Sequence, residues 1–270
     1  MRGMRGKTVV VTGASAGIGE ALAVVLAGRG ANLVLAARNE EALQRVKARC
    51  ETAGGRAVVV PTDVGDAEAC HHLVDRAVEA FGGIDVLVNN AGVTMDARVD
   101  EVKDLGLFER VMRINYLGSV YCTYHALPHL KSRRGLVVAV SSLTGKTGVP
   151  NRSGYAASKH AMHGFFDSLR IELRGTGVDV TVVCPGFVAT NIRDSALGAD
   201  GQPVRQSKHN ERAGDNMDVD TCVAIILKAM DQREREVVMT TKARVAQFLK
   251  LVAPGLVDRI AAKTIQDRQR

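Results

Sequence analysis

The sequence predicts an α/β fold with one doubly wound parallel sheet of about seven strands and helices on both faces. Three observations support this prediction. Short runs of β-branched residues alternate with longer helical patterns, the strand-like runs are apolar throughout, as in Thr8–Val11, and 270 residues suit one such unit. We therefore expect residues 1–270 to form a single domain.

The expected strands and helices follow one another in order. The strands are expected at 8–11, 32–36, 57–61, 85–88, 135–140, 178–183 and 236–239. The helices are expected at 18–28, 39–53, 66–81, 105–131, 153–175 and 218–231, several of them opening on a capping residue such as Ser153. Right-handed crossovers bring the carboxyl ends of parallel strands to one edge of the sheet, where we expect ligands to bind.

Two segments interrupt this alternation. Residues 191–217 are polar and lack apolar periodicity, which favours a substrate lid over a domain linker. Residues 240–270 are a basic C-terminal extension, in which the run 245–260 mixes apolar side chains with charged ones. Because Pro254 and Gly255 interrupt any single amphipathic helix, packing or a subunit contact is favoured there over contact with an anionic membrane.

The composition excludes several classes of protein. With 46% hydrophobic and 24% charged residues, the chain is an ordinary globular sequence rather than a disordered or coiled-coil one. The formal charge is +7, but only 4% of residues are aromatic and there is no Trp, so stacking on single-stranded nucleic acid is not expected.

The cysteines and histidines do not suggest a disulfide framework or a metal site. The five cysteines are widely spaced, which favours a reducing compartment. His125 and His129 stand four residues apart on an expected helix, but no third ligand is evident. No apolar run approaches the length of a membrane span, and no secretory signal is recognised, so the sequence predicts a cytoplasmic protein.

A glycine-rich turn follows the first expected strand and opens the first expected helix. Gly13, Gly17 and Gly19 allow a tight turn in which the backbone N–H groups around Ser15 and Ile18 can approach a pyrophosphate. The same residues also fit G-x-S-x-G, the turn that carries the nucleophile of hydrolases, with Ser15 as the nucleophile. The position at the first strand favours a dinucleotide over the hydrolase and over a turn that serves packing alone.

The end of the second expected strand indicates which dinucleotide is bound. NAD-binding proteins hold the ribose 2′-OH with an acidic residue about 20 residues after the glycines. Here Ala37 stands at that position and Arg38 follows it. Because a guanidinium pairs well with a phosphate, NADP(H) is favoured over NAD(H), although Arg38 as a solvated residue flanking a helix is the alternative.

Between residue 7 and about residue 190 the chain resembles the short-chain dehydrogenase/reductase family. The motifs that carry the resemblance are Thr12 to Gly19, Asp63–Val64, Asn89 to Gly92, Asn115, Ser142, Tyr155 to Lys159, and Pro185 to Thr190. Residues 141–146 and 164–170 look most like the hydroxysteroid dehydrogenases and their lipid-acting relatives. The resemblance implies a Rossmann-type fold and an oxidoreductase.

The residues themselves suggest how such an enzyme would work. Tyr155 and Lys159 stand four apart on one helix, so the ammonium is expected to lower the phenol pKa from its usual value of ~10. Tyr155 would then act as the general acid/base. Ser142 lies just beyond the end of the expected strand 135–140, where its hydroxyl can hold the substrate oxygen.

The resemblance assigns further roles. It implies that Asn115 takes part in a proton relay with Lys159, that Lys159 also holds the nicotinamide ribose, and that Thr190 holds the carboxamide. The residues expected to bind the cofactor are Gly13, Ser15, Gly17, Ile18, Gly19, Arg38, Asp63, Val64, Asn90, Ala91, Gly92, Tyr155, Lys159, Pro185, Gly186, Val188 and Thr190. It also implies a homodimer or homotetramer formed through helices 105–131 and 153–175.

These observations together predict an NADP(H)-dependent carbonyl reductase or alcohol dehydrogenase. The residues expected to contact the substrate are Ser142, Thr144, Val149, Tyr155 and Phe187. The apolar side chains among them favour a steroid-like or lipid-like substrate. The alternative is a non-catalytic NADP-binding regulator, which would need the glycine turn and Arg38 but not the combination of Ser142, Tyr155 and Lys159.

Overall fold

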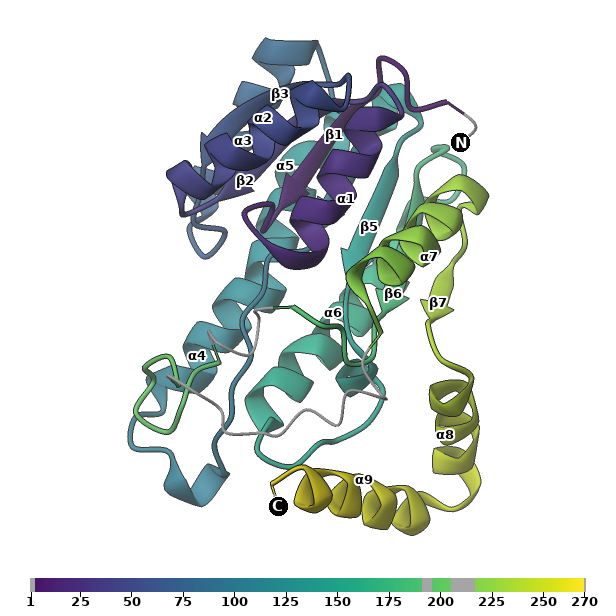
Figure 1. The fold of residues 1–270 in the computed structure, drawn as a ribbon. Helices are drawn as coiled ribbons and strands as arrows, with labels where there is room; N and C mark the ends of the chain where they lie inside the picture. The colour runs from purple at the N-terminus through teal and green to yellow at the C-terminus, as the bar shows by residue number, and fades with distance from the viewer. Residues whose placement is uncertain (1–2, 191–195, 205–216, 270) are drawn as a thin grey trace.

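The computed structural model describes residues 3–190, 196–204 and 217–269 (Figure 1). Its centre is a parallel sheet of seven strands in the order β3-β2-β1-β4-β5-β6-β7, which confirms the predicted doubly wound fold. The strands are β1 (Thr8–Thr12), β2 (Asn32–Ala37), β3 (Arg56–Pro61), β4 (Val86–Asn89), β5 (Leu136–Val140), β6 (Asp179–Cys184) and β7 (Glu236–Val238). The strand order reverses between β1 and β4, so the switch point lies beside the glycine turn.

Helices cover both faces of the sheet. The α-helices are α1 (Gly17–Gly28), α2 (Glu40–Thr52), α3 (Ala67–Phe81), α4 (Gly106–Met112), α5 (Gly118–Arg133), α6 (Ser153–Glu172), α7 (Val219–Gln232), α8 (Thr241–Val252) and α9 (Pro254–Gln269). The shorter helices are η1 (Val99–Glu101), η2 (Arg113–Leu117) and η3 (Leu143–Gly145). Helices α1, α2 and α7 pack on one face, whereas α3, α5 and α6 pack on the other.

Alternating side chains of each central strand pack in two separate hydrophobic cores, one on each face of the sheet. In β1, Val9 and Val11 join the core under α1 and α7, while Val10 joins the core under α3, α5 and α6. All three are fully buried. Burying a side chain of this kind contributes about 1.5–3 kcal/mol, so strands that are apolar on both faces are stabilised only at the centre of such a sandwich.

The predicted helix 105–131 is interrupted. It is α4, a π-helical turn (η2) and α5, so the axis carries an extra residue around Asn115. The expected cap Ser153 is the first residue of α6, and Arg152, which precedes it, makes no side-chain capping bond. The C-terminal extension, for which the sequence predicted no helices, forms α8 and α9, which are separated at Ala253 just before Pro254.

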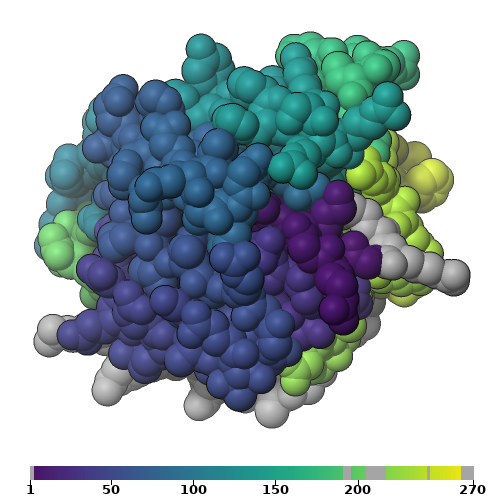
Figure 2. Space-filling view, turned by 90° about the horizontal axis from the view of Figure 1, so that it is seen from above, coloured from purple at the N-terminus to yellow at the C-terminus, as the bar shows by residue number. Residues whose placement is uncertain are grey.

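The two ends of the sheet are differently covered. Figure 2 shows the molecule from above, at the amino ends of the strands. The first half of the chain and the teal residues that follow it cover this end, and the yellow C-terminal residues lie at its margin. The carboxyl ends point to the opposite end, where α8 and α9 lie (Figure 1). Among the described residues, no helix is both long enough and apolar enough to span a bilayer.

Candidate active site

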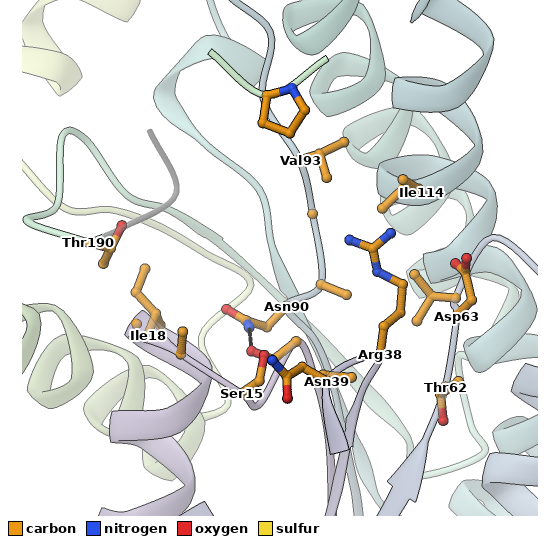
Figure 3. Close-up of a pocket in the computed structure, with 18 of the residues that line it drawn as sticks. Ser15, Ile18, Arg38, Asn39, Thr62, Asp63, Asn90, Val93, Ile114 and Thr190 are labelled. Carbon is orange, nitrogen blue, oxygen red and sulfur yellow. Dashed lines mark hydrogen bonds between the residues drawn. The ribbon is translucent and has the colours of Figure 1, made fainter. Parts of the chain in front are cut away.

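A cavity of about 370 Å³ opens at the carboxyl edge of the sheet, beside the switch point between β1 and β4 (Figure 3). Eleven of the residues expected to bind the cofactor line it: Gly13, Ser15, Gly17, Ile18, Arg38, Asp63, Val64, Asn90, Ala91, Gly92 and Thr190. The cavity is also lined by residues that were not among the expected cofactor ligands: Ala16, Ala37, Asn39, Thr62, Val93, Arg110, Ile114, Leu197 and Pro203.

The glycine turn is shaped by close backbone packing. Gly13 has φ +64°, and a Cβ there would lie 2.8 Å from the Ala91 Cα atom. A Cβ on Gly19 would lie 2.4 Å from the Gly13 carbonyl oxygen, so Gly19 allows helix and turn to meet and does not line the cavity. Ala16 precedes α1 and provides no side-chain cap, which leaves the N–H groups of the first turn available to an anion.

Asn90 and Thr12 hold this turn against the end of β4. The Asn90 amide nitrogen donates to the carbonyl oxygen of Thr12 at 2.9 Å and to that of Gly13 at 3.1 Å. In return, Thr12 Oγ1 accepts hydrogen bonds from the backbone N–H groups of Asn90 and Ala91, both at 3.0 Å. The role of Thr12 was not predicted, although the residue lies within the motif. These bonds fix the edge of the cavity before any ligand binds.

Arg38 is directed into the cavity from the end of β2 (Figure 3). Its side chain is exposed and makes no hydrogen bond or ion pair with the residues that the structure describes. Asn39, its neighbour, caps α2 by accepting a hydrogen bond from Ala42 N at 2.9 Å. Among the described residues the guanidinium therefore has no partner, and it lines the cavity as an exposed cation.

A second group of polar side chains gathers where β5 and α6 meet. Tyr155 and Lys159 are buried in α6, with relative exposures of 8% and 3%. Lys159 Nζ donates to the Val140 carbonyl oxygen at 2.9 Å and lies 5.8 Å from the centre of the Tyr155 ring. Ser142 Oγ accepts from Thr144 N at 3.2 Å. The fold therefore brings Ser142, Tyr155 and Lys159 together as the sequence predicted.

The pKa of Tyr155 is shifted in the direction opposite to that predicted. Burial raises the phenol pKa above 10.0, and this effect exceeds the lowering by the neighbouring hydroxyls of Ser142 and Thr144 and by the charge of Arg152. Thr144 Oγ1 is itself buried without a hydrogen-bond partner at ordinary distance among the described residues. Burial also lowers the pKa of Lys159 to about 8. The phenol is therefore protonated at neutral pH, while most of the Lys159 population carries a charge.

Comparison with known proteins identifies the family. The family model described as short chain dehydrogenase matches residues 7–199. The 11-beta-hydroxysteroid dehydrogenase A of Sesamum indicum is 38% identical over 257 residues, which cover 94% of this chain and 74% of that protein. The chain belongs to the short-chain dehydrogenase family.

Other relatives support the same assignment. Dehydrogenase/reductase SDR family member 7B of Bos taurus is 37% identical, with 99% of this chain and 84% of that protein covered. A short-chain dehydrogenase/reductase of Burkholderia phymatum, solved in complex with NAD, matches the fold with a TM-score of 0.84 and 28% identity, covering 95% of this chain and 96% of that one. These findings place the chain in the hydroxysteroid dehydrogenase-like branch, among oxidoreductases that act on an alcohol or carbonyl. The hydrolase alternative for Ser15 is therefore not supported.

Within this short-chain dehydrogenase, the side-chain amide of Asn115 hydrogen-bonds to other parts of the chain. Its Oδ1 accepts from Val93 N at 2.8 Å, and its Nδ2 donates to Val93 O and to Ser158 Oγ, both at 2.9 Å. These bonds join η2 to the segment after β4 and to α6. A Cβ on Gly92 would lie 3.1 Å from Asn115 Oδ1 and 3.7 Å from Lys159 Nζ, so the two side chains meet across Gly92. The relay role of Asn115 stays a prediction.

The remaining predicted residues lie outside the described cavity. Pro185 and Gly186 pack against η3, with Pro185 O accepting from Leu143 N at 3.0 Å, and Val188 is buried. Val149 and Phe187 both lie close to Arg152: the Phe187 ring centre is 5.8 Å from Arg152 Cζ, and Val149 O accepts from Arg152 N at 3.2 Å. Val149 and Phe187 thus lie near the N-terminus of α6, where Arg152 stands three residues before Tyr155.

Part of the expected lid is described. Leu197 is joined to the segment after β4 by two backbone hydrogen bonds, from Leu197 N to Thr94 O and from Asp96 N to Leu197 O, both 2.9 Å. Arg110 Nη1 donates to Gly201 O at 3.3 Å. Residues 196–204 therefore lie across the cavity wall, to which Leu197 and Pro203 contribute. The rest of the predicted lid, 191–195 and 205–216, lies outside the described residues.

His125 and His129, which the sequence set aside, are half-buried in α5 and do not line the cavity. His125 stacks on His71 of α3 with ring centres 4.6 Å apart. Among the described residues, no three His, Cys, Asp or Glu side chains are grouped as they would be around a metal ion.

Proposed function

We propose that the chain interconverts a ketone and a secondary alcohol with NADP(H), on an apolar substrate. The observation that carries the proposal is the common position of two groups at one edge of the sheet. One is a dinucleotide-sized cavity with Arg38 at its mouth. The other is the Ser142, Tyr155 and Lys159 group at the end of β5 and on α6.

The cavity fits a dinucleotide. The glycine turn, where a Cβ would collide with Ala91, leaves room for a pyrophosphate beside the uncapped N-terminus of α1. Asp63 and Val64 would hold the adenine, Asn90 to Gly92 would line the adjoining ribose, Thr190 would hold the carboxamide and Lys159 the second ribose. When bound, a nicotinamide dinucleotide supplies or accepts a hydride at the substrate carbon.

Tyr155 would move the proton. Because burial keeps its phenol protonated at neutral pH, Tyr155 is ready to donate a proton to a carbonyl oxygen when the substrate is reduced. Ser142 would hold that oxygen through its hydroxyl. Lys159, whose ammonium lies against the ring of Tyr155, stabilises the negative charge left on the phenolate.

Arg38 supports the choice of NADP(H). A 2′-phosphate carries two negative charges that the ribose of NAD lacks, and a guanidinium without other partners among the described residues can bind them by paired, charge-assisted hydrogen bonds. Such a pair contributes about 1.5–3 kcal/mol, or roughly a tenfold to hundredfold preference.

The side chains near Arg152 support an apolar substrate. Val149, Pro150 and Phe187 are apolar residues near the N-terminus of α6. Burying their side chains against a steroid-like or lipid-like ketone would favour binding. A turnover panel that compares apolar ketones with polar sugars tests this directly, and activity confined to the sugars would contradict it.

Titration with NADPH and NADH tests the cofactor assignment. Wild type is expected to bind NADPH more tightly, and Arg38→Ala is expected to lose most of that preference while keeping its affinity for NADH. The matched control is Arg45→Ala, since Arg45 is an exposed arginine of α2 that does not line the cavity. Equal affinity of wild type for both dinucleotides would overturn the assignment.

The second candidate function is a non-catalytic regulator that binds NADP(H). Tight NADPH binding without turnover on any ketone of the panel would favour it. The specific combination of Ser142, Tyr155 and Lys159 argues for catalysis, because a dinucleotide sensor has no use for a buried phenol beside a buried ammonium.

A further inference from the structure

Thr144 carries a buried hydroxyl that the fold leaves without a partner. The residue is 8% exposed, and its Oγ1 atom makes no hydrogen bond at ordinary distance with the residues that the structure describes. A buried hydroxyl in that state destabilises a protein, because it has lost its hydrogen bonds to water and gained none in return. Thr144 follows Ser142 by two residues, so this unused donor lies among the functional groups at the end of β5.

The short helix η3, which contains Thr144, is held directly against α6. Its backbone turn is closed by a hydrogen bond from Gly145 N to Ser142 O at 2.9 Å. A Cβ on Gly145 would lie 2.8 Å from His163 Cδ2, an atom of α6, so the two helices meet without a gap. Thr144 is thus fixed against the helix that carries Tyr155.

The hydroxyls of Ser142 and Thr144 differ in what else they bind. Both hydroxyls lower the pKa of the Tyr155 phenol, an effect that comes from hydrogen bonding to its oxygen. Ser142 Oγ already accepts a hydrogen bond from Thr144 N at 3.2 Å, which directs the Ser142 proton away from that nitrogen and leaves it for the substrate oxygen. Thr144 Oγ1 has no acceptor among the described residues. Its proton is therefore available to the phenol oxygen.

Proton donation leaves a negative charge on the phenol oxygen, and the nearby cations act on it from a distance. Lys159 Nζ donates to the Val140 carbonyl oxygen and lies 5.8 Å from the centre of the Tyr155 ring. Arg152, which precedes α6, acts through its charge. Hydrophobic side chains pack in the same cluster as Tyr155: Met95, Ala97, Leu107, Val111 and Leu197. A buried anion in such surroundings needs a hydrogen-bond donor at its oxygen.

We propose that Thr144 is a further catalytic residue, whose hydroxyl donates a hydrogen bond to the Tyr155 oxygen as the phenol gives up its proton. In that step the phenol O–H bond breaks, an O–H bond forms on the substrate oxygen and the phenolate remains. Ser142 holds the substrate oxygen, whereas Thr144 holds the phenolate oxygen. The assignment rests on the proposed function, because the phenolate forms during turnover only where Tyr155 donates its proton.

The kinetics of ketone reduction separate these two roles. Thr144→Val keeps the shape of the side chain and removes the hydroxyl. We expect its kcat to fall by a factor of about 10 to 100, with the KM for the ketone changed by less than about twofold, since the lost bond is strongest in the transition state. Thr144→Ser keeps a hydroxyl and is expected to retain at least about half of the wild-type kcat.

Thr181→Val is the matched control. Thr181 lies in β6, is fully buried, and its Oγ1 atom also has no hydrogen-bond partner among the described residues. The substitution makes the same chemical change away from Tyr155, so wild-type kinetics are expected. NADPH binding and circular dichroism of each variant check that it is folded.

The ionisation of Tyr155 gives a readout that does not depend on turnover. Its tyrosinate absorbance is obtained by subtracting the spectrum of the same chain with Tyr155→Phe, at the highest pH at which circular dichroism shows all chains folded. Without the donor at the phenolate oxygen, Thr144→Val is expected to show a fraction of ionised Tyr155 about tenfold lower than wild type. Thr181→Val is expected to leave that fraction unchanged.

Three results would overturn the proposal. The first is a Thr144→Val chain with the kcat and the ionised fraction of wild type. The second is a raised KM at unchanged kcat, which would assign Thr144 to the substrate. The third is a Thr144→Ser chain that loses as much as Thr144→Val. A wild type that reduces no ketone would contradict the proposed function, whereas the ionised fraction of Tyr155 would still decide whether Thr144 donates to its oxygen.

Discussion

Lys159 lies against the ring of Tyr155, with its Nζ atom 5.8 Å from the ring centre, and hydrogen-bonds to the Val140 carbonyl oxygen rather than to a carboxylate. Both side chains are buried, and burial shifts both pKa values toward the neutral forms, above 10.0 for the phenol and to about 8 for the ammonium. This arrangement holds a proton on the phenol and a cation beside it at neutral pH. The pair is therefore set for proton donation.

The pH dependence of ketone reduction should follow the deprotonation of the Lys159 ammonium. Reduction needs a protonated Tyr155, whose pKa lies above 10.0, and a cationic Lys159, whose pKa is about 8. We expect the kcat/KM for reduction to be level up to about pH 7 and to fall as the pH rises through about 8. Steady-state rates at saturating NADPH check this. A profile that stays level to pH 10 would contradict the role of Lys159.

Gly19 should tolerate no side chain. A Cβ there would lie 2.4 Å from Gly13 O and 2.5 Å from Asn90 Nδ2, so Gly19→Ala forces the glycine turn and Asn90 apart. We expect it to destabilise the protein by about 2 kcal/mol or more and to weaken dinucleotide binding. Thermal unfolding and dinucleotide titration measure the two effects.

Gly164→Ala is the control for Gly19→Ala. Gly164 lies within α6 and has nothing within 4 Å of its Cβ position, so the substitution should stabilise the helix by about 0.5–1 kcal/mol. If both glycine variants behaved alike, close packing would not be the reason for glycine at position 19.

His163 should make stability fall at acidic pH. Burial, together with the charge of Lys146, lowers its pKa from 6.5 to about 4, although Glu236 and Asp167 act in the opposite direction. Between these two pKa values the unfolded chain binds a proton at this histidine that the folded chain does not. The contribution of His163 to the free energy of unfolding is therefore fully present above about pH 6.5. It falls by about 3 kcal/mol as the pH drops toward about 4.

Denaturant unfolding at a series of pH values measures this contribution. His163→Gln should flatten the pH dependence over that window, whereas His160→Gln should keep it, since His160 is exposed on the same helix. A wild-type slope that persists in His163→Gln would show that another group is responsible.

The sheet could be predicted from the sequence because each strand is apolar on both faces. The expected strand 85–88 is displaced by one residue from β4, and the expected strand 32–36 lacks only Ala37 of β2. Helices α8 and α9 were not predicted, because Pro254 and Gly255 interrupt the apolar run and most of its large side chains are exposed rather than packed on the core.

The site was predictable where motifs mark it and not where the fold assembles it. Gly13, Arg38 and Asn90 line the cavity as expected, since each follows directly on a strand. Arg110, Ile114 and Leu197 join them from α4, η2 and the described part of the lid, which only the tertiary fold brings to that edge. The direction of the Tyr155 pKa was predicted wrongly, because spacing shows that Lys159 is near but not how deeply the phenol is buried.

The most direct test of the central claim compares wild type with Tyr155→Phe in NADPH binding and in NADPH oxidation by an apolar ketone. Removing the phenol hydroxyl takes away the proton donor and leaves the residues of the dinucleotide cavity unchanged. We predict that Tyr155→Phe binds NADPH like wild type but loses turnover by a factor of about 100 or more, while the exposed Tyr124→Phe keeps full activity. Turnover by Tyr155→Phe at the wild-type rate would contradict the account.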